Sequence, residues 1–511
     1  MKKSFLLGCM LLTLQILVYA QSSKIDHYIS TNHKTMLREL MHFLRMPNQA
    51  KDSANIHQNA EFLLNDMRKR GIQHVQLLNA PSQKRTPAVY GEYLTPGATT
   101  TLVFYAHYDG QPVSPEKWHT SLKPFEPVLI NGKIETGAKT IAAEEMDIMR
   151  YPDARIYARS SSDDKSGVMA LLNAFSALRE TGLSPAINIK FFFEGEEEAG
   201  SPHLEEILSA HRSLLQSDAW IICDGPIHQT GRNQLVFGVR GDANMEITVY
   251  GPRRPLHSGH YGNWAPNPGL LLVELLASMK NEKGFVTIKG FYDDVLALND
   301  KEKEALAKIP AVDSMMMREL GFMQPEMQDV GLSMAVNLPS LNINGIESGK
   351  AGSAAANVIP VSASAVLDLR LVKGVDWKKQ QERVVQHIRD QGFFITDRDP
   401  DEQIRLTHPR IAKIRLEKGY NAQKTDMQIP IMQKLIHTIQ KATGKEWVLQ
   451  PGLGGSLPLY VFEQVLNAYP VTLPIANHDN NQHAENENIL VKRFLEGISI
   501  LATVMMLQPN Q

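Results

Sequence analysis

The stretch that decides the fold is FFFEGEEEAGS, residues 191–201, in which a predicted strand ends in a cluster of carboxylates. The strand, expected over 187–193, is apolar on both faces, which is typical of a buried strand in a parallel sheet. The carboxylates belong to Glu194, Glu196, Glu197 and Glu198. Because like charges this close repel one another, a divalent cation at this edge of the sheet is the expected neutraliser. A solvated acidic loop is the alternative.

Histidine and aspartate occur at the ends of two other predicted buried strands and in loops elsewhere. The residues are His107 and Asp109 after strand 101–105, Asp224 after strand 219–223, Asp163 and Asp164 ahead of a helix, and His483 in the loop NQHAENEN. Each residue alone has an ordinary explanation, as a surface histidine or a helix cap. Together they would meet at a topological switch point, where open α/β sheets bind their ligands.

This set of side chains indicates a metal site. Imidazole and carboxylate ligands suit Zn²⁺, with Mn²⁺ or Co²⁺ as alternatives. Two histidines and three carboxylates are too many for one tetrahedral catalytic zinc, but they serve two ions that share a bridging carboxylate. We therefore predict two divalent metal ions per chain, with a remaining glutamate as general base on a shared water. A single-zinc peptidase with structural extra carboxylates is the alternative.

The amino-terminal residues predict export. Residues 1–20 are typical of a signal peptide, because two lysines precede an apolar stretch and Val18-Tyr19-Ala20 fits a cleavage site before Gln21. A retained membrane anchor is the alternative. No later segment is apolar for long enough to span a bilayer, and the net charge of −2 includes no basic stripe that would indicate nucleic acid. We expect a periplasmic or secreted protein with no membrane partner after cleavage.

The pattern of predicted elements divides the rest of the chain. Strands and helices alternate over 21–240, which predicts an α/β domain with a mostly parallel sheet and helices on both faces. Beyond it, strands 245–250 and 363–371 alternate apolar and polar residues, as half-exposed antiparallel strands do. We interpret 241–419 as an inserted α+β domain and 420–511 as the second part of the first domain.

Eight ordered motifs carry a resemblance to a known family. They are HYDGQP (107–112), SSDDKSG (161–167), EGEEEAGS (194–201), the strand end at Asp224, LHSGHYGNWAPNP (256–268), ANVIP (356–360), GGSLP (454–458) and HAENE (483–487). In these the chain resembles the metallohydrolase family that contains carnosine dipeptidase, glutamate carboxypeptidase, aminoacylase and succinyl-diaminopimelate desuccinylase. HYDGQP, with the KW and PFEP that follow it, is most similar to the dipeptidase branch.

The resemblance implies a zinc-exopeptidase-like catalytic domain and a role for each residue of the metal site. One metal would be held by His107 and Asp224, the other by Glu198 and His483, with Asp163 bridging. Glu197 would be the base and proton shuttle, and Asp109 would orient His107. The inserted domain would be a lid and would form a homodimer.

The resemblance also implies substrate contacts. His257 would stabilise the oxyanion, and Asn357 and Arg370 would contact the substrate, with Arg370 as the clamp for a terminal carboxylate. A surface ion pair is the alternative for Arg370. The backbone wall beside the scissile bond would come from Gly454, Gly455 and Ser456.

The chain departs from the family pattern at three places, of which the first two bear on the substrate pocket and the third leaves the predicted ligand Asp163 unaffected. Family members commonly have Arg-Glu before GGS, where this chain has Gly452-Leu453. In dipeptidases the acid there can meet a free substrate amine, which leucine cannot do. The stretch 135–155 is longer than the usual connection and has no clear assignment, and Ser166 stands where glycine is usual.

We predict a metal-dependent hydrolase of amide bonds in dipeptides or short peptides. An N-acyl amino acid deacylase is the alternative within the family, and Leu453 favours it. A non-catalytic binding protein on the same fold is the alternative from a different class.

Overall fold

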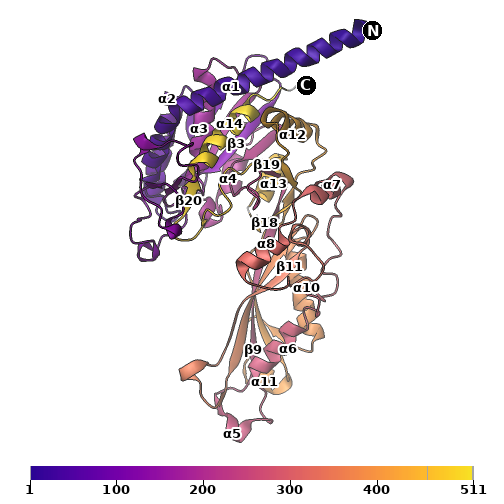
Figure 1. Cartoon of the computed structure of the whole chain (residues 1–511). Helices are drawn as coiled ribbons and strands as arrows, with labels where there is room; N and C mark the ends of the chain where they lie inside the picture. The colour runs from indigo at the N-terminus through magenta and orange to yellow at the C-terminus, as the bar shows by residue number, and fades with distance from the viewer. Residues whose placement is uncertain (1, 457, 509–511) are drawn as a thin grey trace. The chain divides into compact units, whose positions relative to one another are not determined.

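The chain divides into two compact units (Figure 1). The computed structural model describes residues 2–456 and 458–508, with side chains over 23–455 and 458–508. Unit 1 comprises the chain up to Phe237, then Thr425–Gln450, and the chain from Val461 onward; unit 2 comprises Gly238–Lys424 and Pro451–Tyr460. The predicted inserted segment, 241–419, does not include the short second segment of unit 2, Pro451–Tyr460. This second segment contains β18 (Leu453–Ser456), which pairs with β9 (Gly238–Tyr250).

Unit 1 is built on one eight-stranded sheet. In spatial order its strands are β1 (Gln73–Ala80), β2 (Gln83–Tyr93), β6 (Asn188–Glu194), β3 (Thr101–His107), β7 (Ala219–Ile222), β19 (Pro470–Thr472), β8 (Gln234–Val236) and β17 (Val448–Gln450). Strands β6, β3, β7 and β19 are mutually parallel, whereas the β1–β2, β2–β6 and β19–β8 pairs are antiparallel. The parallel centre confirms the predicted α/β class.

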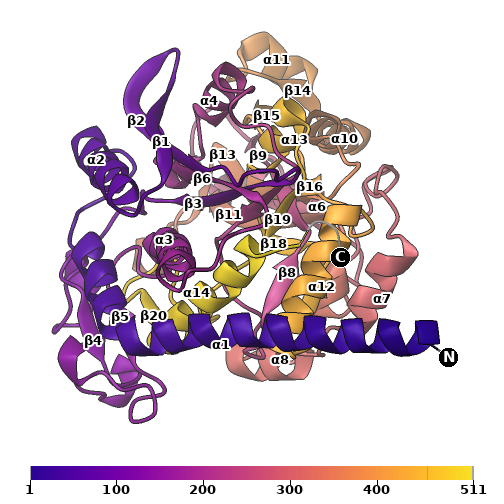
Figure 2. The same cartoon turned by 90° about the horizontal axis from the view of Figure 1, so that it is seen from above.

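Helices cover both faces of this sheet. They are α1 (Lys2–Leu44), α2 (Ser53–Lys69), α3 (Lys165–Glu180), α4 (Leu204–Ala210), α12 (Pro430–Thr443), α13 (Tyr460–Leu466) and α14 (Val491–Met505). Figure 2 shows α3 and α14 on one side of the sheet and α4 and α13 on the other. None of the helices among the described residues has the length and hydropathy of a membrane span. The predicted signal peptide falls on the first part of α1, whose side chains lie outside those described, and it stays a prediction.

The aromatic run of β6 explains why both faces are covered. Successive strand residues point to opposite faces, so Phe191 packs on Phe175 of α3, while Phe192 packs on Trp220. Trp220 in turn packs on Phe462 of α13, with 4.6 Å between the ring centroids. All five rings are fully buried. The strand is therefore held rigidly, and its carboxyl end can position charged side chains.

A small antiparallel sheet borders this domain. It contains β4 (Val128–Ile130), β5 (Arg155–Tyr157) and β20 (Asn488–Leu490). The stretch 135–155, which the sequence leaves unassigned, runs through short 3-10 turns and rejoins the sheet at β5. It is fastened to α1, because Lys34 Nζ donates to the Glu144 carbonyl (2.5 Å).

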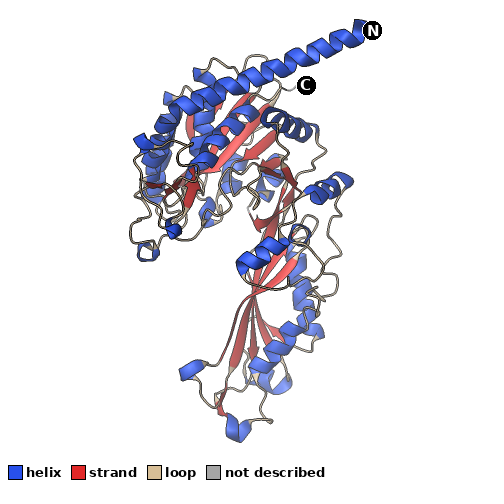
Figure 3. Ribbon diagram, viewed as in Figure 1, coloured by secondary structure: helices blue, strands red, loops and turns tan. Residues whose placement is uncertain are grey.

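Unit 2 has a seven-stranded sheet of mainly antiparallel strands. Its strands are β9, β11 (Ser340–Ser348), β13 (Ser362–Leu371), β14 (Phe394–Thr396), β15 (Ile411–Leu416), β16 (Gln423–Lys424) and β18. Helices α6 (Pro268–Ala277) and α10 (Trp377–Asp390) share one apolar core with the sheet. Figure 3 shows the strands of this unit in red and its helices in blue. The remaining elements are β10 (Leu256–His257), β12 (Val358–Ile359), α5 (Ser258–Tyr261), α7 (Asp300–Lys308), α8 (Asp313–Leu320), α9 (Leu332–Ala335) and α11 (Glu402–Thr407). This arrangement confirms the predicted α+β class.

Candidate metal centre

The carboxyl ends of three neighbouring strands of unit 1 bring the predicted site together. Strand β3 ends at His107, β6 ends at Glu194, and their register places these two residues side by side. On the other side of β3, strand β7 leads through Cys223 to Asp224. The loop before α3 supplies Asp163, and the loop between β19 and β20 supplies His483.

All five predicted ligands lie close together. The Asp163 carboxylate is at their centre, with Oδ1 2.8 Å from His107 Nε2 and Oδ2 3.1 Å from His483 Nε2. His483 Nε2 is also 3.4 Å from Glu198 Oε2, and His107 Nε2 is 3.9 Å from Asp224 Oδ2. One oxygen of Asp163 thus faces each histidine, which is the arrangement that a bridging carboxylate requires.

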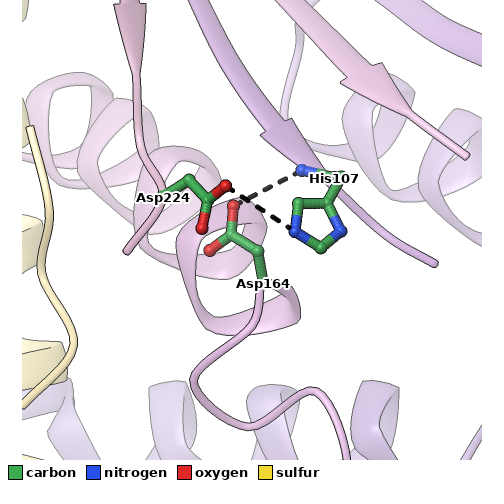
Figure 4. A group of neighbouring side chains, drawn as sticks. All are labelled: His107, Asp164 and Asp224. Atoms are coloured by element: carbon green, nitrogen blue, oxygen red, sulfur yellow. Dashed lines mark hydrogen bonds and ion pairs between the residues drawn. The ribbon is translucent and has the colours of Figure 1, made fainter. Parts of the chain in front are cut away.

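Ligand atoms with the spacing of metal sites form two groups. The first contains His107, Asp164 and Asp224 (Figure 4), and the second contains Asp163, Glu198 and His483; within each, the atoms lie within 4.8 Å of one another. Asp164 was not among the predicted ligands. Its carboxylate accepts hydrogen bonds from the amides of Gly167 (3.2 Å) and His107 (3.4 Å), so it caps α3 and fastens the helix to β3.

Asp109 ties the histidine to the glutamate cluster. Its Oδ1 lies 3.3 Å from His107 Nδ1, so the other ring nitrogen of His107 faces Asp163. The same carboxylate accepts hydrogen bonds from the amides of Glu197 (3.1 Å) and Glu198 (2.9 Å). Asp109 is fully buried. Asp109 therefore positions two predicted ligands, His107 through its ring and Glu198 through its backbone amide.

A further contact to a predicted ligand was missed by the sequence analysis. Gln111 Nε2 donates to Glu198 Oε2 (2.6 Å), which fixes the orientation of that carboxylate. Gln111 belongs to the motif HYDGQP, whose His107 and Asp109 drew attention because they can titrate. An amide side chain carries no such signal, and its partner Glu198 lies 87 residues further along the chain.

Glu197 lies beside the predicted ligands. Its side chain is 12% exposed, and Oε2 is 3.9 Å from His107 Nε2. Burial raises the pKa of the Glu197 carboxyl well above its ordinary value, His107 counteracts this, and the charges of Asp224 and Glu198 add to the rise. A carboxylate with a raised pKa beside candidate metal ligands suits proton transfer.

The carboxylates of the site have histidines as their ion-pair partners among the described residues. Burial first, and the negative charge of Asp163 second, raise the pKa of Asp224 to about 6 and that of Glu198 to about 8. The hydrogen bond with Asp163 raises the pKa of His483 to about 9. Within the described part of the chain, no lysine or arginine forms an ion pair with these carboxylates. Buried carboxylates of this kind need cations, and the donor set of imidazole and carboxylate fits divalent ions.

The other predicted residues belong to unit 2. His257 ends β10 and is exposed, and its Nδ1 accepts a hydrogen bond from the Gly259 amide (3.1 Å). Asn357 directly precedes β12. Gly454 and Gly455 lie in β18, and the side chain of Ser456 lies outside those described. The roles of these residues stay predictions.

Arg370, on β13, is engaged by carboxylates of its own unit. Its Nε donates to Asp368 Oδ2 (3.0 Å) and lies 3.7 Å from Asp242 Oδ1. Arg370 is thus in the ion-paired state that the sequence analysis gave as the alternative to a substrate clamp. A substrate carboxylate would have to compete with Asp368 for it.

Comparison with known proteins assigns the chain to a family. The sequence profile of peptidase family M20/M25/M40 matches residues 103–507. The chain belongs to this family. The predicted resemblance is thereby confirmed.

Individual M20 relatives match over most of their length. The chain is 26% identical over 489 residues to the Cys-Gly metallodipeptidase DUG1 of Candida albicans, covering 91% of this chain and 93% of that protein. It is 25% identical over 439 residues to the Beta-Ala-His dipeptidase of Homo sapiens, covering 84% and 78%. Among solved structures it resembles the M20 family metallo-carboxypeptidase Sso-CP2 from Sulfolobus solfataricus, with a TM-score of 0.73 at 26% identity, covering 93% and 99%.

We expect Asp109→Asn to weaken metal binding and activity by about 10- to 100-fold, since an amide cannot accept from His107 and both glutamate amides at once. The measurement is metal content after dialysis, together with turnover. The control is Asp52→Asn, because Asp52 is the exposed cap of α2 and asparagine caps a helix equally well. Equal metal retention in the two variants would contradict the positioning role of Asp109.

Proposed function

We propose that this protein is a metal-dependent hydrolase of the amide bond in dipeptides or short peptides. Membership of a peptidase family supports the reaction class. The observation that carries the proposal is the Asp163 carboxylate between two histidines, with Glu197 beside them. The names of two relatives, a Cys-Gly metallodipeptidase and a Beta-Ala-His dipeptidase, support dipeptides as the substrate class.

We propose two divalent cations per chain, zinc in the first instance, with manganese or cobalt as alternatives. His107 and Asp224 would hold one, Glu198 and His483 the other, and Asp163 would bridge them. A solved structure of the same fold is described as a dinuclear metal-binding M20 peptidase, which supports the number. When bound, the cations polarise the scissile carbonyl and lower the pKa of an adjacent water.

In the proposed mechanism, Glu197 moves the protons. Its carboxylate takes the proton of the attacking water and returns it to the leaving amine. Burial favours the protonated form between these two steps. Asp109 accepts a hydrogen bond from the Glu197 amide, which fixes the backbone from which this side chain extends toward His107. The buried positions of Asp109 and His107 keep this geometry fixed through the cycle.

The second candidate reaction is hydrolysis of N-acyl amino acids. Leu453 favours it, because a leucine where relatives commonly carry an acid cannot balance a free substrate ammonium. Both reactions break an amide bond with the same centre, and they differ only in what precedes the scissile carbonyl. A binding protein without activity is disfavoured, since the predicted ligands and the base all carry competent side chains.

The experiment that tests the proposal uses the zinc-loaded protein with two panels, free dipeptides such as Cys-Gly and their N-acetylated amino acid counterparts. We expect release of free amino acids from dipeptides, because this chain aligns with dipeptidases over most of their length. The measurement is quantification of new amines. Turnover of the acylated panel alone would replace the proposal by the second candidate, and turnover of neither would contradict both.

Replacement of the proposed base should separate chemistry from metal binding. We expect Glu197→Gln to lower kcat at least about 100-fold, since general base catalysis contributes 10²- to 10⁴-fold, while both cations stay bound. The matched control is Glu205→Gln, an exposed glutamate of α4. Retention of most of the turnover by Glu197→Gln would show that another group takes the proton.

We propose a homodimer formed through unit 2. Strand β11 is an edge strand, and it exposes Ile343 and Ile346. Helix α6 exposes Leu270 (60%) and Val273 (53%), and its first turn lies against Ser348 at the end of β11. Sedimentation equilibrium of the purified protein should give twice the mass of its single chain. A monomer at micromolar concentration would contradict this proposal.

We also propose export to the periplasm or the medium, which the lysine-led apolar stretch of residues 1–20 supports. Neither nucleic acid nor membrane is expected as a partner of the exported form. The mature protein should begin at Gln21 by amino-terminal sequencing. Recovery of the uncleaved chain from the cytoplasm would contradict export.

A further inference from the structure

The loop that carries His483 ends at Glu487, a fully buried glutamate outside the predicted site. Both carboxylate oxygens accept hydrogen bonds. Oε1 accepts from the Ser162 amide (2.9 Å), the Ser162 hydroxyl (3.0 Å) and the Asp163 amide (3.0 Å), and Oε2 accepts from the Ser160 amide (2.9 Å) and Arg159 Nη1 (2.8 Å). Every partner is a donor from the short segment 159–163. This segment leads directly into the Asp163 carboxylate.

Glu487 therefore joins two ligand loops. The amide of Asp163 is one of its partners, and His483 lies four residues before it in the same loop. The backbone continues the connection, because the Ala158 amide donates to the Glu487 carbonyl (3.1 Å). A displacement of Glu487 would move Asp163 and His483 relative to each other.

His483 has little else to hold it. Its side chain is 59% exposed, so packing does not fix the ring. Its backbone has φ of 60°, a left-handed conformation that residues other than glycine seldom adopt, and Asn481 and Asn486 share this conformation at 57° and 59°. A loop of this kind keeps its shape only when its ends are anchored. Glu487 is the anchor on the carboxyl side.

The amino side of the loop has a separate anchor. Arg155 donates through Nη2 to Asp479 Oδ2 (2.8 Å) and through Nη1 to Asn488 Oδ1 (2.7 Å). The backbone amide of Asn488 also donates a hydrogen bond to the Asn480 carbonyl (2.8 Å), which joins the two ends of the loop. These contacts fix where the loop starts and ends, but none of them touches the segment of Asp163. Among the described residues, Glu487 is the one that hydrogen-bonds the backbone of this loop's end to the Asp163 segment, in addition to the contact of the His483 ring with the Asp163 carboxylate.

We propose that Glu487 is a positioning residue that sets the affinity of the cation position formed by Asp163, Glu198 and His483. The inference rests on the proposed metal centre and assigns a determinant of its second position. Charge-assisted hydrogen bonds from five donors hold the two loops at the distance that lets Asp163 and His483 face one cation. Groups that orient metal ligands commonly change metal affinity by about 10- to 100-fold.

The carboxylate is required because all five partners donate. A glutamine of the same shape has one accepting oxygen and one donating amide group. In either orientation it turns a donor toward the three partners of Oε1 or the two partners of Oε2. Glu487→Gln therefore removes part of the hydrogen bonding between this residue and segment 159–163, with little change in side-chain volume.

The test is a Co²⁺ titration of the metal-free full chain, followed by visible absorption. We expect wild type to bind two equivalents, and Glu487→Gln to bind the first normally and the second about 10- to 100-fold more weakly. The control is Glu485→Gln, which makes the same charge change in the same loop and should titrate like wild type. Two unchanged binding steps in Glu487→Gln would overturn the proposal.

A role in stability alone is separable from this. Such a role would lower the melting temperature of the metal-free protein without shifting the Co²⁺ curve. If Glu487→Gln does not fold, Ser162→Ala decides the question, because it removes only the hydroxyl donor. It should weaken the second step in the same direction but less, and an unshifted second step would overturn the proposal. Since the readout is metal binding, an absence of peptidase activity in wild type would contradict the proposed function without affecting this test.

Discussion

The Asp163 carboxylate lies between the imidazoles of His107 and His483, and the rest of the site depends on this arrangement. Glu198 and Asp224 add two more buried carboxylates, and burial raises the pKa of both. Ionised carboxylates in such a place are costly unless cations pair with them, and two divalent ions would supply that pairing. The fold supplies the geometry by ending parallel strands at one edge of a sheet whose faces are both covered, so that charged groups can be held where solvent is scarce.

Hydrogen bonds from the next layer of residues hold this arrangement in place. Asp109 connects His107 with the backbone of Glu197 and Glu198, and Glu487 connects the segment of Asp163 with the loop of His483. Each of these carboxylates is fully buried and is surrounded by donors. Acidic side chains thus do two jobs here, as candidate ligands and as the acceptors that orient them. The positions of the candidate ligands therefore depend on the hydrogen bonds that Asp109 and Glu487 accept.

Much of this could be predicted from the sequence. Apolar runs such as 187–193 followed by carboxylates indicated inner parallel strands with a site at their ends, and ordered motifs identified the candidate ligands. Glu487 and Gln111 could not be assigned, because their partners come from segments hundreds or tens of residues away and no periodicity reports such contacts. The short return of Pro451–Tyr460 to unit 2 depends on strand pairing with β9 and has no local signal either.

The central claim is that five side chains hold a pair of cations beside Glu197. The most direct test is anomalous diffraction at the zinc edge from crystals of the zinc-loaded protein. Two peaks about 3.5–4 Å apart are expected, both next to Asp163, with one beside His107 and Asp224 and the other beside Glu198 and His483. A single peak, or peaks bound by other residues, would contradict the account.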